Sequence, residues 1–373
     1  MNKLAVCLGE SMAVLVPDHP GPLDGVDTFR RGIGGAESNV ARGLAALGNR
    51  TAWLSRVGDD GFGRHLLDAL RADGVDVTGV ETDPDRPTGL YVKEIGAGPP
   101  HDLPVGTSRL HYYRAGSAAS AMGPEFVDRP PAAALLAEAD LLHLSGITAA
   151  LSDSCLALLH HLMIGRRAGQ VVSFDLNWRP ALWRDYDPAV LRPLLDAADV
   201  VLLGADEALA AFGVNTPDKL RELLPSPRSL VIKDGALRAT TVDRAGGCVT
   251  EPALAVHVVD AVGAGDAFAA GYLTGVLRDL DEPRRLRLGH LTAAATLVVT
   301  GDHGRPLGLD GLLDASPEEW AAARIAAPPG HRPAPRRDGP AGPHPAPAAR
   351  PDARTTPRAD APPAPDDPPA ARP

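Results

Sequence analysis

Short apolar runs alternate along most of the chain with amphipathic or Ala/Leu-rich stretches. The clearest runs are LLHLSG (141–146), VVSFDLN (171–177), VVLLGAD (200–206) and SLVIKDG (229–235), with helix-like stretches such as 151–168 and 187–197 between them. A parallel strand that is buried on both faces reads as a continuous apolar run, and each such strand needs a helical crossover to the next. The pattern therefore predicts an α/β fold: a doubly wound, mostly parallel sheet with helices on both faces.

Several of these runs end in polar residues, namely Ser145, Asp175, Asn177, Asp206 and Lys233. In open sheets of this kind, ligands bind beyond the carboxyl ends of the strands. We therefore expect a functional site at that edge of the sheet.

Two segments, 12–35 and 88–117, break the alternation. The second contains TGLYVKEI and SRLHYYRAGS, which are rich in β-branched and aromatic residues, and such residues favour strands. A small β-sheet inserted into the α/β body is expected, either as a lid or as an ordinary edge sheet. Tyr113 follows Tyr112 on the opposite face of its strand, where we expect it to pack. The first 16 residues predict an opening strand.

Composition separates the end of the chain from the rest. In residues 328–373, 16 of 46 residues are proline, and no Ile, Leu, Val, Phe, Trp or Tyr occurs. Such a segment cannot bury a core, so we expect a disordered Pro/Ala/Arg-rich tail after a folded domain of residues 1–327. The whole chain has a formal net charge of −10. Because the tail is slightly basic, the domain is more acidic still, which argues against a nucleic-acid partner.

The three cysteines are widely spaced and form no C-x-x-C motif, so the sequence suggests neither a disulfide framework nor a zinc site. The N-terminal apolar run is interrupted by Gly9, Glu10 and Ser11, unlike a secretory signal. No stretch has the roughly 18 uninterrupted apolar residues of a membrane helix. These features predict a soluble, cytoplasmic protein with no membrane partner.

The run LAVHVV (254–259) is typical of a strand, and the motif VGAGDAF (262–268) that follows it precedes a helix-like stretch. The N–H groups at a helix start are unpaired, and small residues let a phosphate approach them, so Gly263, Ala264 and Gly265 could form an anion hole. Asp266 could then accept a proton from a hydroxyl group that attacks a phosphoryl group. On this motif alone, a glycine turn with a capping aspartate is the alternative.

Other phosphate-binding motifs are missing from the sequence. It contains no Gly-Lys pair, no G-x-G-x-x-G and no protein-kinase signature, so phosphoryl transfer would need another scaffold.

A second glycine motif, RRGIGGAESN (30–39), also precedes a helix. Its polar residues Glu37, Ser38 and Asn39 fall in the first helical turn. Backbone and side chains there could hold a polyol, although a plain capped helix start also fits.

Both glycine motifs, in this order and about 230 residues apart, resemble the two signatures of the PfkB/ribokinase family of carbohydrate kinases. The likeness covers residues 3–315, and the stretch RVGDDGFGRHLLDALRADGVDV (56–77) is similar to the V-G-x-D-x-x-G segment of that family. The resemblance implies a ribokinase-like fold, with the small β-sheet as a lid. It also makes residues 1–327 a kinase domain.

Three further stretches are similar to the kinases of 2-keto-3-deoxygluconate within that family: HYYRAGSAAS (111–120), LHLSGIT (142–148) and FDLNWRPALW (174–183). This sugar acid carries a carboxylate and a carbonyl group, which guanidinium and phenol donors suit. A neutral sugar such as ribose calls mainly for Asp and Asn.

The resemblance assigns roles to named residues. It implies a substrate site of Gly34, Gly35, Asn39, Tyr91, Tyr112, Arg114, Arg179 and Asp266. It makes Asp266 the catalytic base, with the N–H groups of Gly263, Ala264 and Gly265 as the transition-state anion hole. For the two arginines, a surface or structural ion pair is the alternative.

The resemblance also implies ATP and Mg²⁺ as cofactors, with a monovalent cation as a further option. The nucleotide side would use Lys233, Gly235, Gly263, Gly265 and Glu207. Glu207 would orient water bound to Mg²⁺, or else be an exposed helix residue. The stretch GDHGRP (301–306) would complete the nucleotide pocket.

Three positions depart from the family pattern, namely Gly204, Arg238 and Ala261. They bear on nucleotide affinity and on any cation site rather than on phosphoryl transfer itself.

The implied activity is transfer of the γ-phosphoryl group of ATP to a hydroxyl group of 2-keto-3-deoxygluconate, giving the 6-phosphate. A kinase of fructose or another neutral sugar, and a non-catalytic sugar-binding protein on the same fold, remain alternatives. An exposed β lid also offers a surface for homo-oligomer formation.

Overall fold

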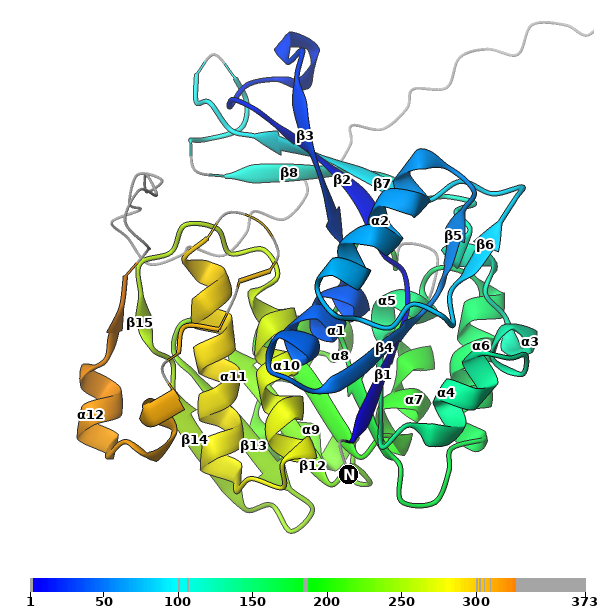
Figure 1. Ribbon diagram of the computed structural model, residues 1–373. Coiled ribbons are helices and arrows are strands. Elements are labelled where there is room, and N and C mark those ends of the chain that lie inside the picture. Colours follow the sequence, from blue (N-terminus) through cyan, green and yellow to red (C-terminus); the bar gives the residue numbers. More distant parts are fainter. Residues whose placement is uncertain are drawn as a thin grey trace, which may run out of the picture. The chain divides into compact units, whose positions relative to one another are not determined.

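The computed structural model describes residues 3–99, 101–105, 107–183, 187–299, 301, 303–304, 306–308 and 310–326. Within these residues the main sheet has eight strands, in the order β14-β13-β12-β11-β10-β9-β1-β4 (Figure 1). In that order they span Cys248–Pro252, Arg238–Asp243, Ser229–Asp234, Val200–Gly204, Val171–Asp175, Leu141–Ser145, Leu4–Leu8 and Arg50–Leu54. The pairs from β12 to β4 are parallel, and β13 and β14 add an antiparallel edge. The predicted mostly parallel sheet is confirmed.

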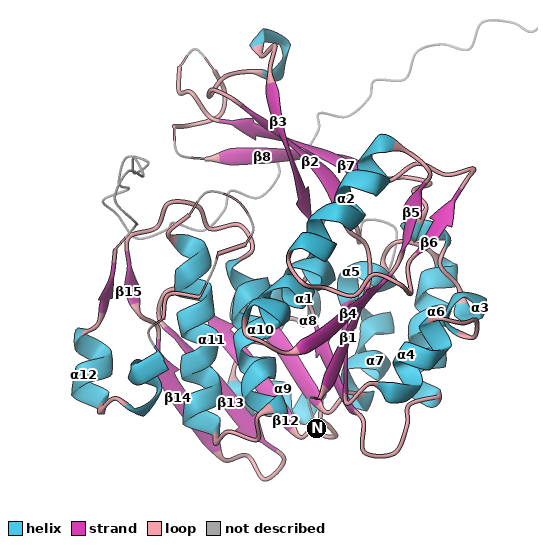
Figure 2. Ribbon diagram, in the orientation of Figure 1, coloured by secondary structure: helices cyan, strands magenta, loops and turns pink. Residues whose placement is uncertain are grey.

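Helices cover both faces of this sheet (Figure 2). One face packs against α1 (Ala36–Ala46), α2 (Gly61–Ala72), α10 (Ala264–Leu277) and α11 (Glu282–Leu297). The other face packs against α3 (Pro124–Val127), α4 (Ala132–Glu138), α5 (Gly146–Ala149), α6 (Asp153–Ile164), α7 (Leu191–Ala197), α8 (Ala205–Phe212) and α9 (Pro217–Leu223). The two-sided cover explains why the central strands β1, β9, β10 and β11 are mostly apolar.

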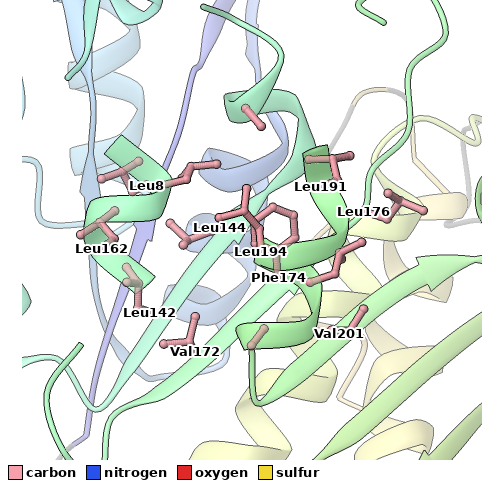
Figure 3. Packing of buried hydrophobic residues seen from close by; sticks show 14 of the residues in the cluster. Leu8, Leu142, Leu144, Leu162, Val172, Phe174, Leu176, Leu191, Leu194 and Val201 are labelled. Carbon is pink, nitrogen blue, oxygen red and sulfur yellow. The ribbon is translucent and has the colours of Figure 1, made fainter. Parts of the chain in front are cut away.

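Alternate residues of one strand enter opposite cores. In β11, Val201 packs on the side of α7, whereas Val200 and Leu202 pack on the side of α10. Figure 3 shows the first of these cores, where Phe174 of β10 meets Leu194 of α7. Because both faces are buried, both carry mainly apolar side chains, and the alternation typical of a half-buried strand is missing.

A second, four-stranded sheet has the strand order β3-β2-β7-β8. We call this small sheet the lid. Its strands are Phe29–Gly34, Met12–Pro17, Leu90–Ile95 and Ser108–Tyr113. Figure 1 shows them together at the top of the view, beyond the end of β1. The inserted small sheet predicted at 12–35 and 88–117 is confirmed.

Smaller elements complete the fold. Strands β5 (Arg56–Gly58) and β6 (Glu81–Asp83) form one short pair, and helix α12 (Pro317–Ala322) packs its Trp320 near the end of α11. Single 3-10 turns lie at Leu23–Gly25, Ala119–Ala121, Pro188–Val190 and Asp310–Asp314.

The opening strand expected in the first 16 residues is present, but it spans only part of them. The segment forms β1 in the main sheet and β2 in the lid, separated by Gly9, Glu10 and Ser11. No side chain fits at Gly9, because a Cβ atom built there would lie 2.1 Å from the Glu37 carboxyl carbon. Hydrophobicity alone could not show that two sheets share this run.

The segment 254–259, whose run LAVHVV resembles a strand, contributes only β15 (Ala255–Val256). It pairs with β16 (Arg324–Ile325) outside the main sheet. His257 N–H still donates to Ile325 O in β16, but Val259 N–H donates to Leu297 O at the end of α11, at 2.7 Å. Helix α10 therefore starts from a loop.

The predicted disordered tail at 328–373 lies outside the described residues. Tyr113 does not pack as expected: its side chain is 62% exposed on the outer side of β8. Of the helices that the structure describes, none is both long and apolar enough to cross a membrane.

Candidate active site

The candidate site lies where α10 and α1 begin, beside the carboxyl ends of β10 and β12. Helix α10 starts after Gly263, whose φ of 78° is the left-handed conformation that glycine adopts without strain. The predicted turn at Gly263–Gly265 is therefore one residue of turn followed by helix, since Ala264 and Gly265 already belong to the first helical turn. Asp266 follows them in the same turn, half-buried.

Two amide side chains hold the Asp266 carboxylate. Asn39 Nδ2 in α1 donates to Asp266 Oδ2 at 2.9 Å, and Asn177 Nδ2 beyond β10 donates to Oδ1 at 3.3 Å. The amide oxygens of both asparagines are buried and have no hydrogen-bond partner within the described part of the chain. Two acceptors therefore lie beside Asp266 with capacity for the hydroxyl groups of a ligand.

The protonation of Asp266 is finely balanced. Burial raises its pKa to about 7, and the negative charge of Asp175 acts in the same direction. The hydrogen bond from Asn39 and the positive charges of Arg179 and Lys233 limit the rise. A carboxyl group with a pKa near neutral pH can both accept and return a proton, as a general base must.

Lys233, at the end of β12, lies beside the start of α10. Its Nζ is 3.0 Å from Asp175 Oδ2, and a Cβ atom built on Gly265 would lie 3.7 Å from it. Burial alone would lower the pKa of Lys233, but the nearby carboxylates of Asp175 and Glu207 outweigh it and raise that pKa. The lysine is thus a cation held next to the first helical turn.

A cavity of about 410 Å³ opens on the other side of that turn. It is lined by Lys233, Gly235, Ala264 and Gly265 together with mainly apolar residues from β13, the 253–261 segment, α10 and α11, including Ala239, Leu254, Ala261, Phe268, Ala294 and Leu297. An apolar cavity of this size with few polar groups suits the flat ring system of a nucleotide base. Four residues expected on the nucleotide side or in the anion hole meet here.

Glu207 and Arg179 contact one another. Arg179 Nη1 donates to Glu207 Oε1 at 3.2 Å, and Glu207 Oε2 accepts the backbone N–H of Gly204 at 2.8 Å. Arg179 is 46% exposed. Glu207 thus caps the start of α8 and also pairs with Arg179, so the residues expected on the metal side and on the substrate side contact one another.

A buried acidic side chain holds Arg114 in place. Arg114 forms an ion pair with Glu10, a residue that is 1% exposed and that also accepts the hydroxyl group of Ser117 at 2.7 Å. Its guanidinium carbon lies 5.8 Å from the ring centre of Tyr112, and the rings of Tyr112 and Tyr91 are 5.6 Å apart. The structure therefore gathers Tyr91, Tyr112 and Arg114 on the lid as expected, and adds the ion pair that was the alternative for Arg114.

The glycine pair at the start of α1 permits close packing. A Cβ atom on Gly35 would lie 2.3 Å from the carbonyl oxygen of Glu10, so no side chain fits there. Gly34 ends β3, opposite Met12 of β2. The chain can therefore pass tightly from lid to helix, which places Asn39 one turn further on.

Glu37, in the first turn of α1, is fully buried. Its Oε1 accepts the hydroxyl groups of Ser145 and Thr148 at 2.6 and 2.7 Å. Burial raises its pKa, and these two hydrogen bonds offset part of the rise. The sequence placed Glu37 in a possible polyol site, but the structure places it behind the site, where it ties α1 to β9.

Sequence reasoning missed three neighbours of the expected residues. Asp175 and Asn177 were noted only as polar residues at a strand end, and Glu10 only as an interruption of an apolar run. The D-x-N spacing after a buried strand was the available signal for the first two. No local pattern marks Glu10, because its partner Arg114 is far along the chain.

Two of the three departures from the family pattern line the cavity, whereas Gly204 is the residue before α8. Arg238 pairs with Asp234 at 3.4 Å while lining the cavity, and Ala261 lines it too. In the 301–306 stretch, Asp302 and Arg305 lie outside the described residues.

Comparisons with known proteins point the same way. A family model described as pfkB family carbohydrate kinase matches residues 2–305. The 2-dehydro-3-deoxygluconokinase of Thermoproteus tenax is 39% identical over 307 residues, which cover 80% of this chain and 89% of that protein. The protein of the same name from Bacillus subtilis (strain 168) is 36% identical over 313 residues, covering 81% of this chain and 92% of its own.

Solved structures match the fold. The PfkB protein from Polaromonas sp. JS666 has a TM-score of 0.71 at 33% identity, covering 85% of this chain and 100% of that one. A sugar kinase of Pyrococcus horikoshii in complex with ATP has a TM-score of 0.70 at 24% identity, covering 85% of this chain and 99% of that one. The expected ribokinase-like fold is confirmed.

Proposed function

Because the chain belongs to the pfkB family of carbohydrate kinases, we propose that it transfers the γ-phosphoryl group of ATP to the primary hydroxyl group of 2-keto-3-deoxygluconate, giving the 6-phosphate. Two relatives, 39% and 36% identical, are kinases of this sugar acid by name. The observation that carries the proposal is the setting of Asp266, in the first turn of α10 and held by two amide groups.

Asp266 is the catalytic base in this proposal. Its ionised carboxylate accepts the proton of the attacking hydroxyl group as the bond to phosphorus forms. The unpaired amide oxygens of Asn39 and Asn177 accept hydrogen bonds from neighbouring sugar hydroxyl groups and so orient the sugar. Closure of the lid keeps water from taking the place of the sugar.

The start of α10 stabilises the negative charge that develops on the phosphoryl group. The N–H groups of Gly263, Ala264 and Gly265 lie at the positive end of the helix dipole, and Lys233 adds a full charge beside them. The adenine base occupies the apolar cavity, with Gly235 at its lining, and the triphosphate extends toward Lys233.

Magnesium fits the residues on the nucleotide side without a dedicated protein cage. Among the described residues, no group of three His, Cys, Asp or Glu side chains could hold a metal, and Mg²⁺ in kinases is bound by one or two carboxylates, water and phosphate oxygens. Glu207 would hold it through water, and the ion would neutralise charge on the phosphates. A monovalent-cation requirement stays a prediction, to be tested by assay in buffers without Na⁺ or K⁺.

The sugar carboxylate and carbonyl group are recognised by Arg114, Arg179, Tyr91 and Tyr112. Glu10 pairs with Nη2 of the Arg114 guanidinium, and the other N–H groups of that guanidinium would bind the sugar carboxylate. Arg179 is exposed enough to exchange Glu207 for the carboxylate of the substrate. That exchange would also release Glu207 toward the metal.

A kinase of a neutral sugar such as fructose is a second candidate, and one observation favours it. Both arginines already have carboxylate partners, Glu10 and Glu207, so the site is balanced in charge without an acidic substrate. An assay with both kinds of sugar therefore has to distinguish the two functions.

A coupled assay of ADP release with 2-keto-3-deoxygluconate, fructose and ribose tests the proposal. We expect turnover with the sugar acid, and in Arg114→Ala and Arg179→Ala a KM for it that rises by about tenfold or more, because a charge-assisted hydrogen bond is lost. Preferential turnover of fructose, with a KM that these variants leave unchanged, would establish the neutral-sugar function instead.

We also propose that the protein forms a homo-oligomer through the lid. Strands β3 and β8 are the edges of that sheet, and exposed edges invite pairing. Tyr113 on the outer side of β8 is 62% exposed, which supports an apolar contact there.

A further inference from the structure

One ion pair joins the lid to the loop in front of α10. Lys93 Nζ in β7 lies 2.8 Å from Asp260 Oδ2, and the two side chains are 14% and 17% exposed. The two residues are 167 positions apart in the sequence. The pair is therefore a partly desolvated tertiary contact, unlike an ion pair at the open surface, which contributes little.

Lys93 lies on the face of the lid that looks toward the site. It is two residues from Tyr91 on β7, so both side chains leave the strand on the same side. Tyr91 stands opposite Tyr112 in the register, and Lys93 opposite Leu110. The strand that carries one of the expected substrate residues thus also carries the lysine that reaches Asp260.

Asp260 in turn shapes the approach to the anion hole. Its Oδ1 accepts the backbone N–H of Val262 at 3.2 Å, and Val262 directly precedes Gly263. The backbone just before it is fixed as well, because Val259 N–H donates to Leu297 O. The Asp260 carboxylate therefore contacts the lid through Oδ2 and the turn before α10 through Oδ1.

We propose that Lys93 is a positioning residue, which transmits the position of the lid through Asp260 to the turn that presents the N–H groups of Gly263, Ala264 and Gly265. A sugar bound against Tyr91 fixes β7, β7 fixes Lys93, and Lys93 holds Asp260 and Val262 in place. The inference rests on the proposed phosphoryl transfer but not on the identity of the sugar. Its effect falls on the rate of transfer rather than on sugar affinity, because only the anion hole is displaced when the pair is lost.

The experiment compares Lys93→Met, Lys93→Arg, Asp260→Asn and the double variant Lys93→Met/Asp260→Asn. Lys3→Met is the matched control: Lys3 Nζ lies 2.7 Å from Asp279 Oδ2, but these side chains are 39% and 80% exposed, and Asp279 follows the far end of α10. Circular dichroism and thermal unfolding establish that each variant folds. Steady-state kinetics use the best sugar of the panel.

We expect kcat to fall about ten- to hundredfold in Lys93→Met and in Asp260→Asn, as for a misplaced catalytic group, with sugar KM nearly unchanged. The double variant should be no slower than either single one, because both remove the same link. Lys93→Arg should recover most of the rate, and Lys3→Met should match the parent protein.

Hydrogen–deuterium exchange provides a readout that needs no substrate. Without ligands, the amide groups of residues 261–268 should exchange faster in Lys93→Met than in the parent protein or Lys3→Met. Unchanged kcat and exchange in Lys93→Met would overturn the inference, and so would a raised sugar KM with normal kcat, which would make Lys93 a direct sugar ligand. Failure of the proposed function would give a different result, because the parent protein would then turn over no sugar of the panel. The hydrogen–deuterium exchange of Lys93→Met would still test the inference independently.

Discussion

At the scale of single residues, Asp266 combines two opposing needs. It must be ionised to accept a proton, yet burial raises its pKa to about 7. The hydrogen bond from Asn39 and the charges of Lys233 and Arg179 keep the rise within the range in which a base works near neutral pH.

The pH dependence of kcat/KM follows from this balance, because that ratio reports groups of the free enzyme. We expect it to rise as Asp266 ionises, with an apparent pKa near 7, and to level off above it. Measurement from pH 5 to pH 9 with a pH-insensitive coupling system checks this. A profile already flat below pH 6 would assign the base to a group with an ordinary carboxyl pKa.

Stability should respond to the same residue in the opposite sense to activity. The raised pKa means that the folded protein binds a proton more tightly than the unfolded chain, so ionisation costs stability as pH rises from the ordinary value of 3.8 toward about 7, and the full cost remains above that. Asp266→Asn removes the charge. We expect it to be more stable than the parent protein at pH 8, by about 1 to 3 kcal/mol, and to lose that advantage near pH 4.

Urea unfolding at pH 8 and pH 4 measures the difference. If Asp266→Asn is less stable than the parent protein at pH 8, the contacts of the Asp266 carboxylate contribute more to the free energy of unfolding than the cost of its burial.

Residue-level inference from the sequence reached the groups that lie in short motifs. Asp266, Asn39 and Lys233, which are proposed site residues, could be predicted because each lies in a glycine motif or at a strand end. Glu10 and Asp260 form ion pairs with Arg114 and Lys93, which are distant in the chain. Such partners are set by tertiary packing, and no local pattern contains that information.

At the scale of elements, the long apolar runs were predictable because burial on both faces leaves no other pattern. The errors came where one short run served two sheets, as with β1 and β2, or left the sheet altogether, as with the residues after β15. Apolar residues show that a segment is buried but not which neighbour buries it. The small sheet was predictable from its β-branched and aromatic residues, whereas a function as a lid stays a proposal that its place beyond the end of β1 supports.

The outer side of the lid gives a prediction about assembly. If copies of the chain associate there, Tyr113→Glu should shift the protein toward monomer, because a charge would be buried in an apolar contact. Sedimentation velocity measures the shift. Ile164→Glu is the matched control, since Ile164 in α6 is 87% exposed and lies away from the lid. Equal effects of the two variants would place the interface away from Tyr113. No effect of either variant would mean that the interface lies elsewhere or that the protein is a monomer.

At the scale of the whole molecule, residues 1–327 are proposed to form the kinase domain and residues 328–373 a tail outside it. The family match ends at residue 305, and the residues that build the site all precede it. A chain that stops at residue 327 should therefore keep the kcat and KM of the full chain within about twofold, since surface changes away from a site have small effects. A large loss of turnover would give the tail a part in catalysis.

The most direct test of the account is the turnover of Asp266→Asn with ATP and 2-keto-3-deoxygluconate. Removing a general base should lower kcat by about a hundred- to ten-thousandfold, while thermal unfolding shows an intact fold and calorimetry shows that the sugar acid still binds. Turnover close to that of the parent protein would contradict the assignment of Asp266 as the base, and with it the proposed mechanism.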